Sequence, residues 1–550
     1  MPQALTYPGV YIEEIPSGVH TIVGVATSIA AFIGWANQGP TDEAVLVESW
    51  SDFQSQFGGL TNYNGIPNYL GYAVQQFFAN GGQQAYIVRV VWDGTQTAAS
   101  GSPQACATAS ASGIGGTLTL YASSPGAWGN NILVNIIPFG TGGRFTLQVL
   151  YAPTGQTPQV VESFANLSVT PTDPQYVVTV INNDSQYVTF INPANPGQTP
   201  AAPTGAPAAT PSSASPPAWP PGDQFQGGLD GAVLIPATDG NFEIAIGPDT
   251  SATSTNNFGL RLLDRVDIFN LLCVPAETDA ATIQDLQAYC ALKRAFYIID
   301  CPQVATTSLL AANGPYGTTQ GSPNLTGSNL TGVNSPNSAY YFPWIQAPDP
   351  LAGNRTALFP PCGFVAGIYA ATDASRGVWK APAGIDASLT GVSGLQFNLT
   401  DNENGDLNVQ AINCLRQFKV YGDVVWGART LQGNDQAGSQ WKYVPIRRLA
   451  LFLESSLYDG TQWVVFEPND ERLWGQIRLN VGSFMQGLFL QGAFQGTTPQ
   501  QAYFVKCDSE NNPQSSIDMG VVNILVGFAP LYPAEFVVIQ IQQMAGQLAT

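Results

Sequence analysis

Apolar residues recur at helical spacing in one long stretch near the C-terminus, residues 466–494. The apolar positions are Leu473, Ile477, Val481, Phe484 and Leu488. Polar side chains fall between them, largely on the opposite side. Asn469 precedes the run as a candidate N-cap, and Asp470 and Glu471 suit the positive end of a helix dipole. The pattern predicts an amphipathic helix of about five turns.

Short β-prone runs follow this helix, at residues 502–506, 521–528 and 535–541. A similar run, YPGVYIEEI, lies at the other end of the chain, at residues 7–15. A strand at a free end has unpaired amides and carbonyls, so it must join a sheet of its own chain or of a neighbour.

Two segments alternate between strand and helix patterns. In the first, strands are predicted at 23–35, 44–47 and 85–92, with a helix at 67–80. In the second, a strand at 266–274 precedes a helix that is capped at Thr278 or Asp279 and ends at Lys293, and a strand follows at 295–300. Near-continuous apolar strands joined by helices indicate parallel crossovers covered on both faces.

The remaining stretches have different residue patterns. Residues 97–190 hold short alternating runs, typical of a β-rich insertion, at 117–121, 132–137, 145–150 and 176–181. Residues 191–222 form a Pro/Ala/Ser/Thr linker that cannot bury enough apolar surface to order itself. Helices are predicted at 407–415 and 444–457, with a strand at 462–466. The fold class expected is a mixed α/β and α+β multidomain protein with extended terminal strands.

Composition narrows the possible partners. Only 10% of the 550 residues are charged, well below the ~25% of ordinary soluble domains, which suits a subunit packed in an assembly. The net charge of −20 disfavours nucleic acid and anionic membranes as partners. The apolar stretch at 521–541 is broken by Pro530, Pro533 and Glu535, so we expect no membrane insertion. The N-terminal residues, MPQALTYPGV, have no basic region followed by an apolar run, so we expect no signal peptide. Seven dispersed cysteines indicate buried thiols in a reducing compartment.

No catalytic constellation is apparent. The single histidine, His20, is interpreted as an exposed residue of the N-terminal arm. Residues 401–406, DNENGD, fail the register of a calcium loop and are interpreted as an Asn-Gly turn before a helix. Three acids near strand ends, Asp264, Asp267 and Asp300, are expected to be caps and turn residues. We therefore expect no enzyme activity, no metal and no cofactor.

Several longer motifs carry a family resemblance. They are YPGVYIEE at 7–14, SWSDFQSQFGG at 49–59, GVWKAPAG at 377–384, LTDNENGDLNVQAINCLRQF at 399–418 and FEPNDERLWGQIR at 466–478. In this order they resemble contractile tail sheath proteins of phages and phage-tail-like injection particles. The resemblance covers roughly residues 1–95 and 260–550. Residues 97–230 lie outside the resemblance, as expected for a variable outer insertion.

The resemblance implies a structural role. Sheath subunits form stacked hexameric rings around an inner tube and contract to drive that tube through a target envelope. The implied partners are further copies of the chain, the tube protein, and baseplate and terminal cap proteins, assembled in the bacterial cytoplasm. The family core has been called subtilisin-like by fold, but no protease activity is expected, because the single histidine, His20, is interpreted as an arm residue and not as a catalytic one.

The resemblance also suggests a division of the chain. The segments are an N-terminal arm (1–20), a first part of the core (21–96), the outer insertion (97–230), the α/β core (231–400), a tube-facing C-terminal domain (401–530) and a C-terminal arm (531–550).

Two sets of residues are predicted to make contacts between molecules. For strand exchange between subunits they are Val10, Tyr11, Ile12, Val537, Val538 and Ile539. For the tube surface they are Glu471, Arg472 and Arg478. The alternative function class is a secreted β-rich adhesin or hydrolase-like protein, suggested by the Thr/Asn/Gly texture and the Pro-rich linker.

Overall fold

The computed structural model describes residues 20–540 apart from several internal segments. Those segments are 64–65, 93–107, 114–115, 140–142, 154–155, 194–198, 201, 204–223, 232–233, 237–239, 248–257, 317–331 and 436–437. The chain divides into two compact units. The large unit is Ala26–Arg448, and the small unit combines Met1–Val25 with Leu449–Thr550.

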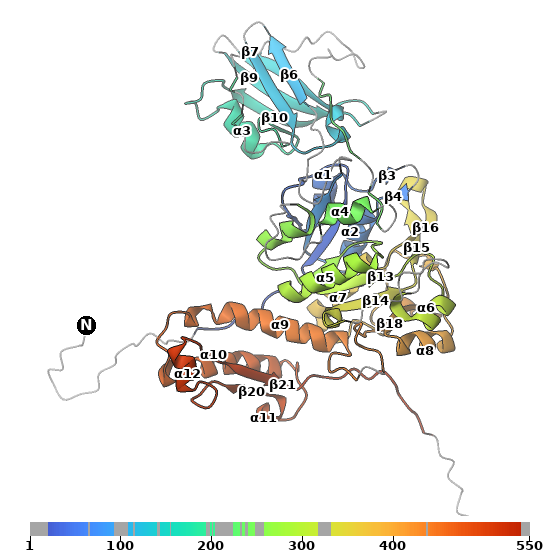
Figure 1. Cartoon of the computed structure of the whole chain (residues 1–550). Coiled ribbons are helices and arrows are strands. Elements are labelled where there is room, and N and C mark those ends of the chain that lie inside the picture. Colours follow the sequence, from blue (N-terminus) through green and yellow to red (C-terminus); the bar gives the residue numbers. More distant parts are fainter. Residues whose placement is uncertain are drawn as a thin grey trace, which may run out of the picture. The chain divides into compact units, whose positions relative to one another are not determined.

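The large unit is built on an eight-stranded sheet (Figure 1). In spatial order its strands are β19 (Gly422–Val425), β18 (Ile412–Phe418), β14 (Ser338–Phe342), β13 (Phe296–Asp300), β12 (Leu271–Cys273), β1 (Ala30–Trp35), β5 (Ala85–Val90) and β2 (Val45–Val47). The six inner strands pair in parallel, and the two edge strands pair antiparallel. Strands β1, β12, β13 and β14 are buried along their whole length, as expected for a sheet covered on both faces.

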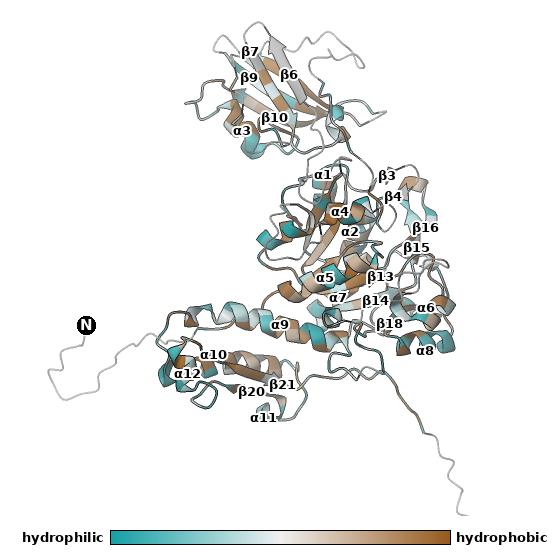
Figure 2. Cartoon of the chain, viewed as in Figure 1, coloured by the Kyte–Doolittle hydropathy of each residue, from teal (hydrophilic) through white to brown (hydrophobic). Residues whose placement is uncertain are grey.

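Helices supply that cover. The longest are α2 (Tyr69–Ala79), α5 (Ala280–Lys293) and α7 (Cys362–Arg376). Shorter ones are α1 (Trp50–Phe57), α4 (Asn241–Ile246), α6 (Thr307–Asn313) and α8 (Asp401–Val409). In Figure 2 the central strands and α2 are largely brown, the colour of hydrophobic residues. Helix α7 approaches α2 very closely at Gly363, where a Cβ atom would lie 2.4 Å from the carbonyl oxygen of Ala73.

Two further antiparallel pairings complete this part of the unit. One is a three-stranded sheet of β16 (Arg355–Phe359), β15 (Ile345–Asp349) and β17 (Gly394–Leu395), in that order. The other pairs β3 (Asn62–Tyr63) with β4 (Ile66–Pro67).

A β-rich section interrupts the large unit between β5 and α4. One of its sheets has the order β10 (Gln159–Leu167), β9 (Arg144–Tyr151), β8 (Ile132–Phe139), and the other β11 (Val188–Thr189), β7 (Gly116–Ala122), β6 (Thr108–Gly113). Their inner residues share one hydrophobic core with α3 (Val177–Asp184). The buried guanidinium of Arg89 donates to the carbonyl oxygens of Ala36, Gly39 and Pro125, and so fixes the chain near the start of this section.

The small unit is formed mainly by the C-terminal part of the chain. Helix α9 (Val444–Gly460) leads into it, followed by α10 (Glu471–Leu490) and α11 (Pro499–Ala502). Strands β20 (Tyr503–Lys506) and β21 (Leu525–Phe528) form an antiparallel pair, and α12 (Gln514–Asp518) lies between them in sequence.

The mixed α/β class and most predicted elements are confirmed. Helix α10 spans 20 residues and buries Leu473, Ile477, Val481 and Leu488 as the apolar pattern predicts. The strand–helix–strand segment around α5 pairs β12 with β13 in parallel, and Asp279 is the N-cap of α5. The candidate N-terminal strand at 7–15 lies outside the described residues.

Five local predictions are wrong. The N-cap of α10 is Asp470, because Asn469 uses its side chain for Trp474 and the Val521 carbonyl instead. Residues 401–406 lie within α8, which begins after a capping box formed by Thr400 and Glu403. The predicted helix at 407–415 is the end of α8 followed by strand β18.

The other two errors concern strands. Residues 462–464 form a 3-10 turn, η6 (Gln462–Val464). The run at 176–181 mostly belongs to helix α3, because burial of Val177, Val178 and Ile181 at helical spacing outweighs their strand propensity. The predicted strand at 266–274 is regular only over β12.

Candidate assembly interface

Helix α10 is fixed within the small unit by its cap and its apolar face. The Asp470 carboxylate accepts hydrogen bonds from the amides of Arg472, at 2.9 Å, and Leu473, at 3.1 Å. These two bonds satisfy amides that the first turn leaves without a partner. The opposite face of the helix is left to solvent, with Leu479 and Leu490 exposed.

The three residues predicted to face a tube do not behave alike. Glu471 and Arg478 form an ion pair at 2.7 Å, and Arg478 also donates to the carbonyl oxygen of Cys507. Arg478 therefore links α10 to the end of β20. Arg472 is exposed on the first turn of the helix. The structure thus brings Glu471 and Arg478 together and presents Arg472 separately.

In the part of the chain that the structure describes, β20 and β21 form a sheet of two strands. Their register places Tyr503 opposite Phe528 and Lys506 opposite Leu525. Phe504 and Leu525 are about half exposed. A two-stranded sheet is marginal by itself, and the outer edges of such a pair have backbone groups that can accept a further strand.

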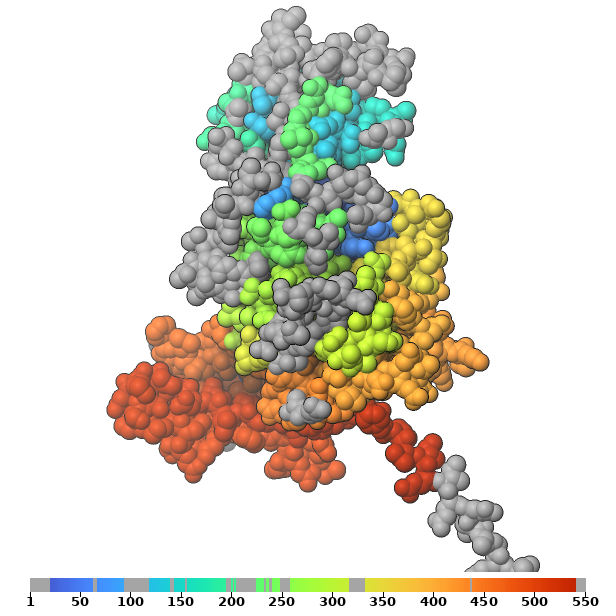
Figure 3. All heavy atoms as spheres, turned by 45° about the vertical axis from the view of Figure 1, so that its right-hand side comes forward, coloured from blue at the N-terminus to red at the C-terminus, as the bar shows by residue number. Residues whose placement is uncertain are grey.

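The last described residues leave this sheet without forming regular secondary structure. After β21, the chain is held near Phe494 and Gln495, since Gln495 donates to the carbonyl of Ala529 and Phe494 bridges Pro530. Beyond that point, Phe536, Val537, Val538 and Ile539 are 73–81% exposed. Figure 3 shows the end of the described chain, in red, as a narrow string of residues. Four consecutive large apolar side chains in this state are typical of a segment that pairs elsewhere.

The N-terminal end of the described chain belongs to the same unit. His20 is exposed, as expected, and its ring stacks on Trp463 with ring centroids 4.3 Å apart. The amide of Val25 donates to Ser456 Oγ on α9. Val10, Tyr11 and Ile12 lie outside the described residues. Both ends of the described chain therefore belong to the small unit.

Asp300 lies at the carboxyl edge of the parallel sheet and acts as a cap. It is buried, and its carboxylate accepts hydrogen bonds from the amides of Ala276, at 2.9 Å, and Cys362, at 2.7 Å. Burial raises the pKa of Asp300 to about 6, although these hydrogen bonds lower it. Because Cys362 is the first residue of α7, Asp300 holds that helix against the end of β13.

Asp264 is also engaged structurally, as a neighbour of helix α5. It pairs with Lys293 at 2.9 Å and accepts a hydrogen bond from Tyr289 Oη at 3.0 Å.

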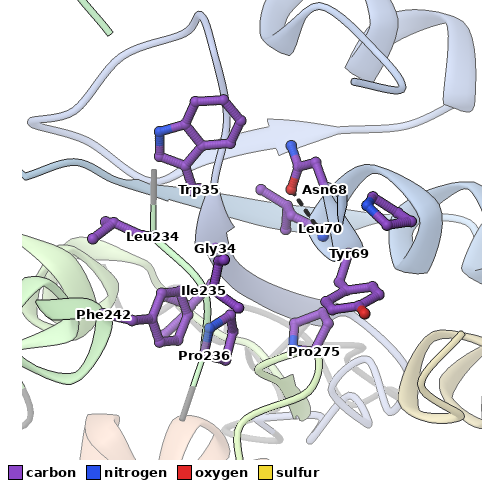
Figure 4. Close-up of a pocket in the computed structure, with 12 residues that line it drawn as sticks. Gly34, Trp35, Asn68, Tyr69, Leu70, Leu234, Ile235, Pro236, Phe242 and Pro275 are labelled. Atoms are coloured by element: carbon purple, nitrogen blue, oxygen red, sulfur yellow. Dashed lines mark hydrogen bonds between the residues drawn. The ribbon is translucent and has the colours of Figure 1, made fainter. Parts of the chain in front are cut away.

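One small cavity lies at the same sheet edge (Figure 4). It has a volume of ≈ 30 Å³, room for about one water molecule. Its lining is mostly apolar, from Trp35 at the end of β1, Leu70 on α2 and the segment 234–236. Ligands of open α/β sheets bind at such edges, but this cavity is too small for them.

Other signals of chemistry are sparse in the described part of the chain. No group of three potential His, Cys, Asp or Glu ligands lies close enough there to hold a metal ion. None of the helices described is both long and apolar enough to cross a bilayer.

Family comparisons identify the fold. Residues 265–431 match the phage tail sheath protein central domain, and residues 436–544 match the phage tail sheath C-terminal domain. The chain belongs to the tail sheath family. This membership favours the sheath interpretation over the secreted adhesin or hydrolase.

Individual tail sheath relatives are distant. A tail sheath protein of Vibrio phage KVP40 is 28% identical over 167 residues, covering 30% of this chain and 23% of that protein. A putative prophage major tail sheath protein of Pseudomonas aeruginosa is 26% identical over 195 residues, covering 35% of this chain and 48% of that protein. The chain thus spans less than half the length of these curated relatives.

The structural match extends over nearly the whole chain. The sheath complex of an extracellular contractile injection system, PVC, in its contracted state covers 98% of this chain, with a TM-score of 0.55 and 21% identity. The match includes 99% of that sheath chain. At this identity the likeness concerns the fold.

Sequence reasoning missed two contacts that hold the small unit together. The N-cap Asp470 could have been predicted, because it is an Asp residue directly before the helical run. The stack of His20 on Trp463 joins residues far apart in sequence, and no local pattern indicates it.

Proposed function

We propose that this chain is the structural subunit of a contractile sheath. Copies polymerise as stacked hexameric rings around an inner tube, and the sheath shortens to drive the tube through a target envelope. Family membership supports the sheath role. The likeness to a contracted injection-system sheath supports a sheath that contracts.

The observation that carries the proposal is that the small unit contains both a two-stranded sheet and an exposed apolar segment that belongs to no strand. Among the described residues, sheet β20–β21 has two strands, and residues 536–539 are apolar, exposed and in no strand. We propose that Val537, Val538 and Ile539 of one subunit, and Val10, Tyr11 and Ile12 of another, join this sheet on a third. Backbone hydrogen bonds then link subunits while their compact bodies reorient.

The remaining partners follow from the same role. The N-terminal part of α10 and the loop before it, with Glu471, Arg472 and Arg478, are proposed to face the tube through shallow polar contacts. Baseplate and terminal cap proteins would end the stack, and assembly would take place in the bacterial cytoplasm. The proposed layout keeps arms at 1–20 and 531–550, core segments at 21–96 and 231–400, an outer insertion at 97–230 and a tube-facing domain at 401–530.

Negative-stain microscopy of the purified protein tests the proposal. We expect striated hollow cylinders from the full chain. A variant lacking residues 1–15 should give folded subunits that do not polymerise, with an unchanged circular dichroism spectrum. Cylinders of normal length from the deletion variant would refute strand exchange through the N-terminal arm. Monodisperse particles from the full chain, under all assembly conditions, would refute the sheath role itself.

A further inference from the structure

The hairpin formed by β18 and β19 ends in an apolar tip. The strands pair from Leu415 opposite Val425 to Phe418 opposite Gly422. The connecting turn is Lys419, Val420 and Tyr421, and Gly422 has a φ of +73°, which closes the turn. Turns of this kind usually contain Gly, Asn, Asp or Ser. Here Val420 is 83% exposed and Tyr421 is 50% exposed.

The stem of the hairpin is held firmly, so the exposure of the tip belongs to the folded state. Strand β18 pairs in parallel with β14. On the other side, Gly384 and Leu389 donate to the carbonyl oxygens of Val425 and Asp423, which covers the edge of β19.

Side chains below the tip add to this support. The rings of Phe418 and Trp426 lie 4.5 Å apart, and the Arg416 guanidinium lies over the Phe418 ring. Arg416 is itself fixed by an ion pair with Asp401 at 2.8 Å. The apolar tip therefore has a rigid aromatic base.

Charge indicates what the tip contacts. Lys419 is exposed beside Val420, whereas the hairpin's acid, Asp423, is buried. The whole chain has 38 acidic and 18 basic residues. A second copy of the chain therefore carries about two acidic residues for each basic residue. An apolar tip flanked by a cation complements a partner with this excess of carboxylates.

We infer that the β18–β19 tip is a contact between copies of this chain, seated on an acidic, partly apolar surface of a neighbouring subunit. The inference rests on the proposed sheath function and adds a contact separate from strand exchange. Unlike the arms, this contact joins folded bodies. It therefore contributes to how subunits pack in one state of the sheath, extended or contracted. The arms, in contrast, keep subunits connected when the sheath changes between these states.

The first test is the double variant Val420→Ser/Tyr421→Ser in the full chain. Removing two apolar side chains from an interface should raise the protein concentration needed for cylinder formation roughly tenfold. Thermal unfolding of the subunit should not change, because both side chains are exposed. Val333→Ser is the matched control, since Val333 is 86% exposed elsewhere in the large unit. A double variant that assembles like this control would overturn the inference.

A photo-crosslinker identifies the partner. Tyr421→p-benzoylphenylalanine, irradiated in assembled particles, should give a covalent dimer of this chain, with the second site in a peptide that contains Asp or Glu. Crosslinking to a different component of the particle, or no crosslink in intact cylinders, would overturn the inference. These outcomes leave the sheath function standing. Failure of the wild-type chain to form cylinders would instead refute both.

Discussion

At the scale of single residues, Glu277 is an unusual carboxyl group. Its side chain is fully buried, and Oε1 accepts a hydrogen bond from the Asp279 amide at 2.6 Å. In the described part of the chain, Oε2 has no hydrogen-bond partner. Burial, together with the nearby Glu243, raises the pKa of Glu277 to about 8. The residue is therefore largely protonated in the folded subunit at neutral pH.

This protonation makes the stability of the large unit depend on pH. The unfolded group has a pKa of 4.5, so the folded state binds the extra proton between pH 4.5 and about 8. The part of the stability that depends on protonated Glu277 is fully present below pH 4.5 and is lost as the pH rises towards 8. Glu277→Gln is neutral throughout and should escape this loss. The unfolding free energy of the variant minus that of the wild type should therefore increase by on the order of 3 kcal/mol between pH 5 and pH 8.

Urea denaturation at several pH values measures this difference. The raised pKa of Asp300 is common to both proteins, so its effect cancels in the comparison. Parallel stability curves for the variant and the wild type would show that Glu277 is ionised in the folded subunit.

At the scale of elements, long periodic segments were predictable and short apolar runs were not. Helix α10 and strand β5 have patterns of sufficient length to be assigned locally. Residues 407–415 mix Leu, Val, Ile and Ala in a way that suits a helix or a buried strand. Residues 412–415 form a strand because β18 pairs with β14, which lies far away in the sequence. No local pattern in the sequence indicates this pairing. The start of α8 could have been predicted from the capping-box pattern of Thr400 and Glu403.

The N-cap of α10 can be tested directly. Asp470→Ala removes the acceptor for the amides of Arg472 and Leu473 and should cost about 1 kcal/mol. Hydrogen exchange of a peptide covering the first two turns should become faster. Asp470→Asn retains the acceptor oxygen and should exchange nearly as the wild type does. Equal exchange in Asp470→Ala would mean that tertiary packing alone fixes this end.

The contact between α7 and α2 gives a second test at this scale. At Gly363, a Cβ atom would lie 2.4 Å from the Ala73 carbonyl oxygen, which is backbone and cannot move aside cheaply. Gly363→Ala should therefore destabilise the large unit by about 1–3 kcal/mol. Gly405, within α8, has open space around it, so Gly405→Ala should be neutral or stabilising by up to ~1 kcal/mol. Similar denaturation midpoints for both variants would contradict this packing.

At the scale of the whole molecule, the feature that matters for assembly is that both ends of the described chain belong to the small unit. Residues 20–25 contact α9 and η6, and the last described residues leave from the β20–β21 sheet. The proposed exchange contacts are therefore concentrated on one unit, while the β-rich section belongs to the other. A change in the β-rich section should leave strand exchange intact.

Proline substitutions in the C-terminal segment test the exchange itself. Proline has no amide hydrogen and is excluded from the interior of a sheet. Val537 and Val538 are each about 80% exposed and lie in no strand of their own chain, so Val537→Pro and Val538→Pro should leave the subunit folded. Successive amides of a strand point to opposite sides, so at least one of these variants should lose cylinders in a pelleting assay.

The threonine variants Val537→Thr and Val538→Thr are the controls, because they keep both the amide and the β-branched shape. Their cylinders should match those of the wild type in length. If both proline variants also formed cylinders of that length, the backbone of this segment would not pair in the assembly. Subunits would then be connected through side-chain surfaces such as the β18–β19 tip, and a contracting sheath would have to break and remake its contacts.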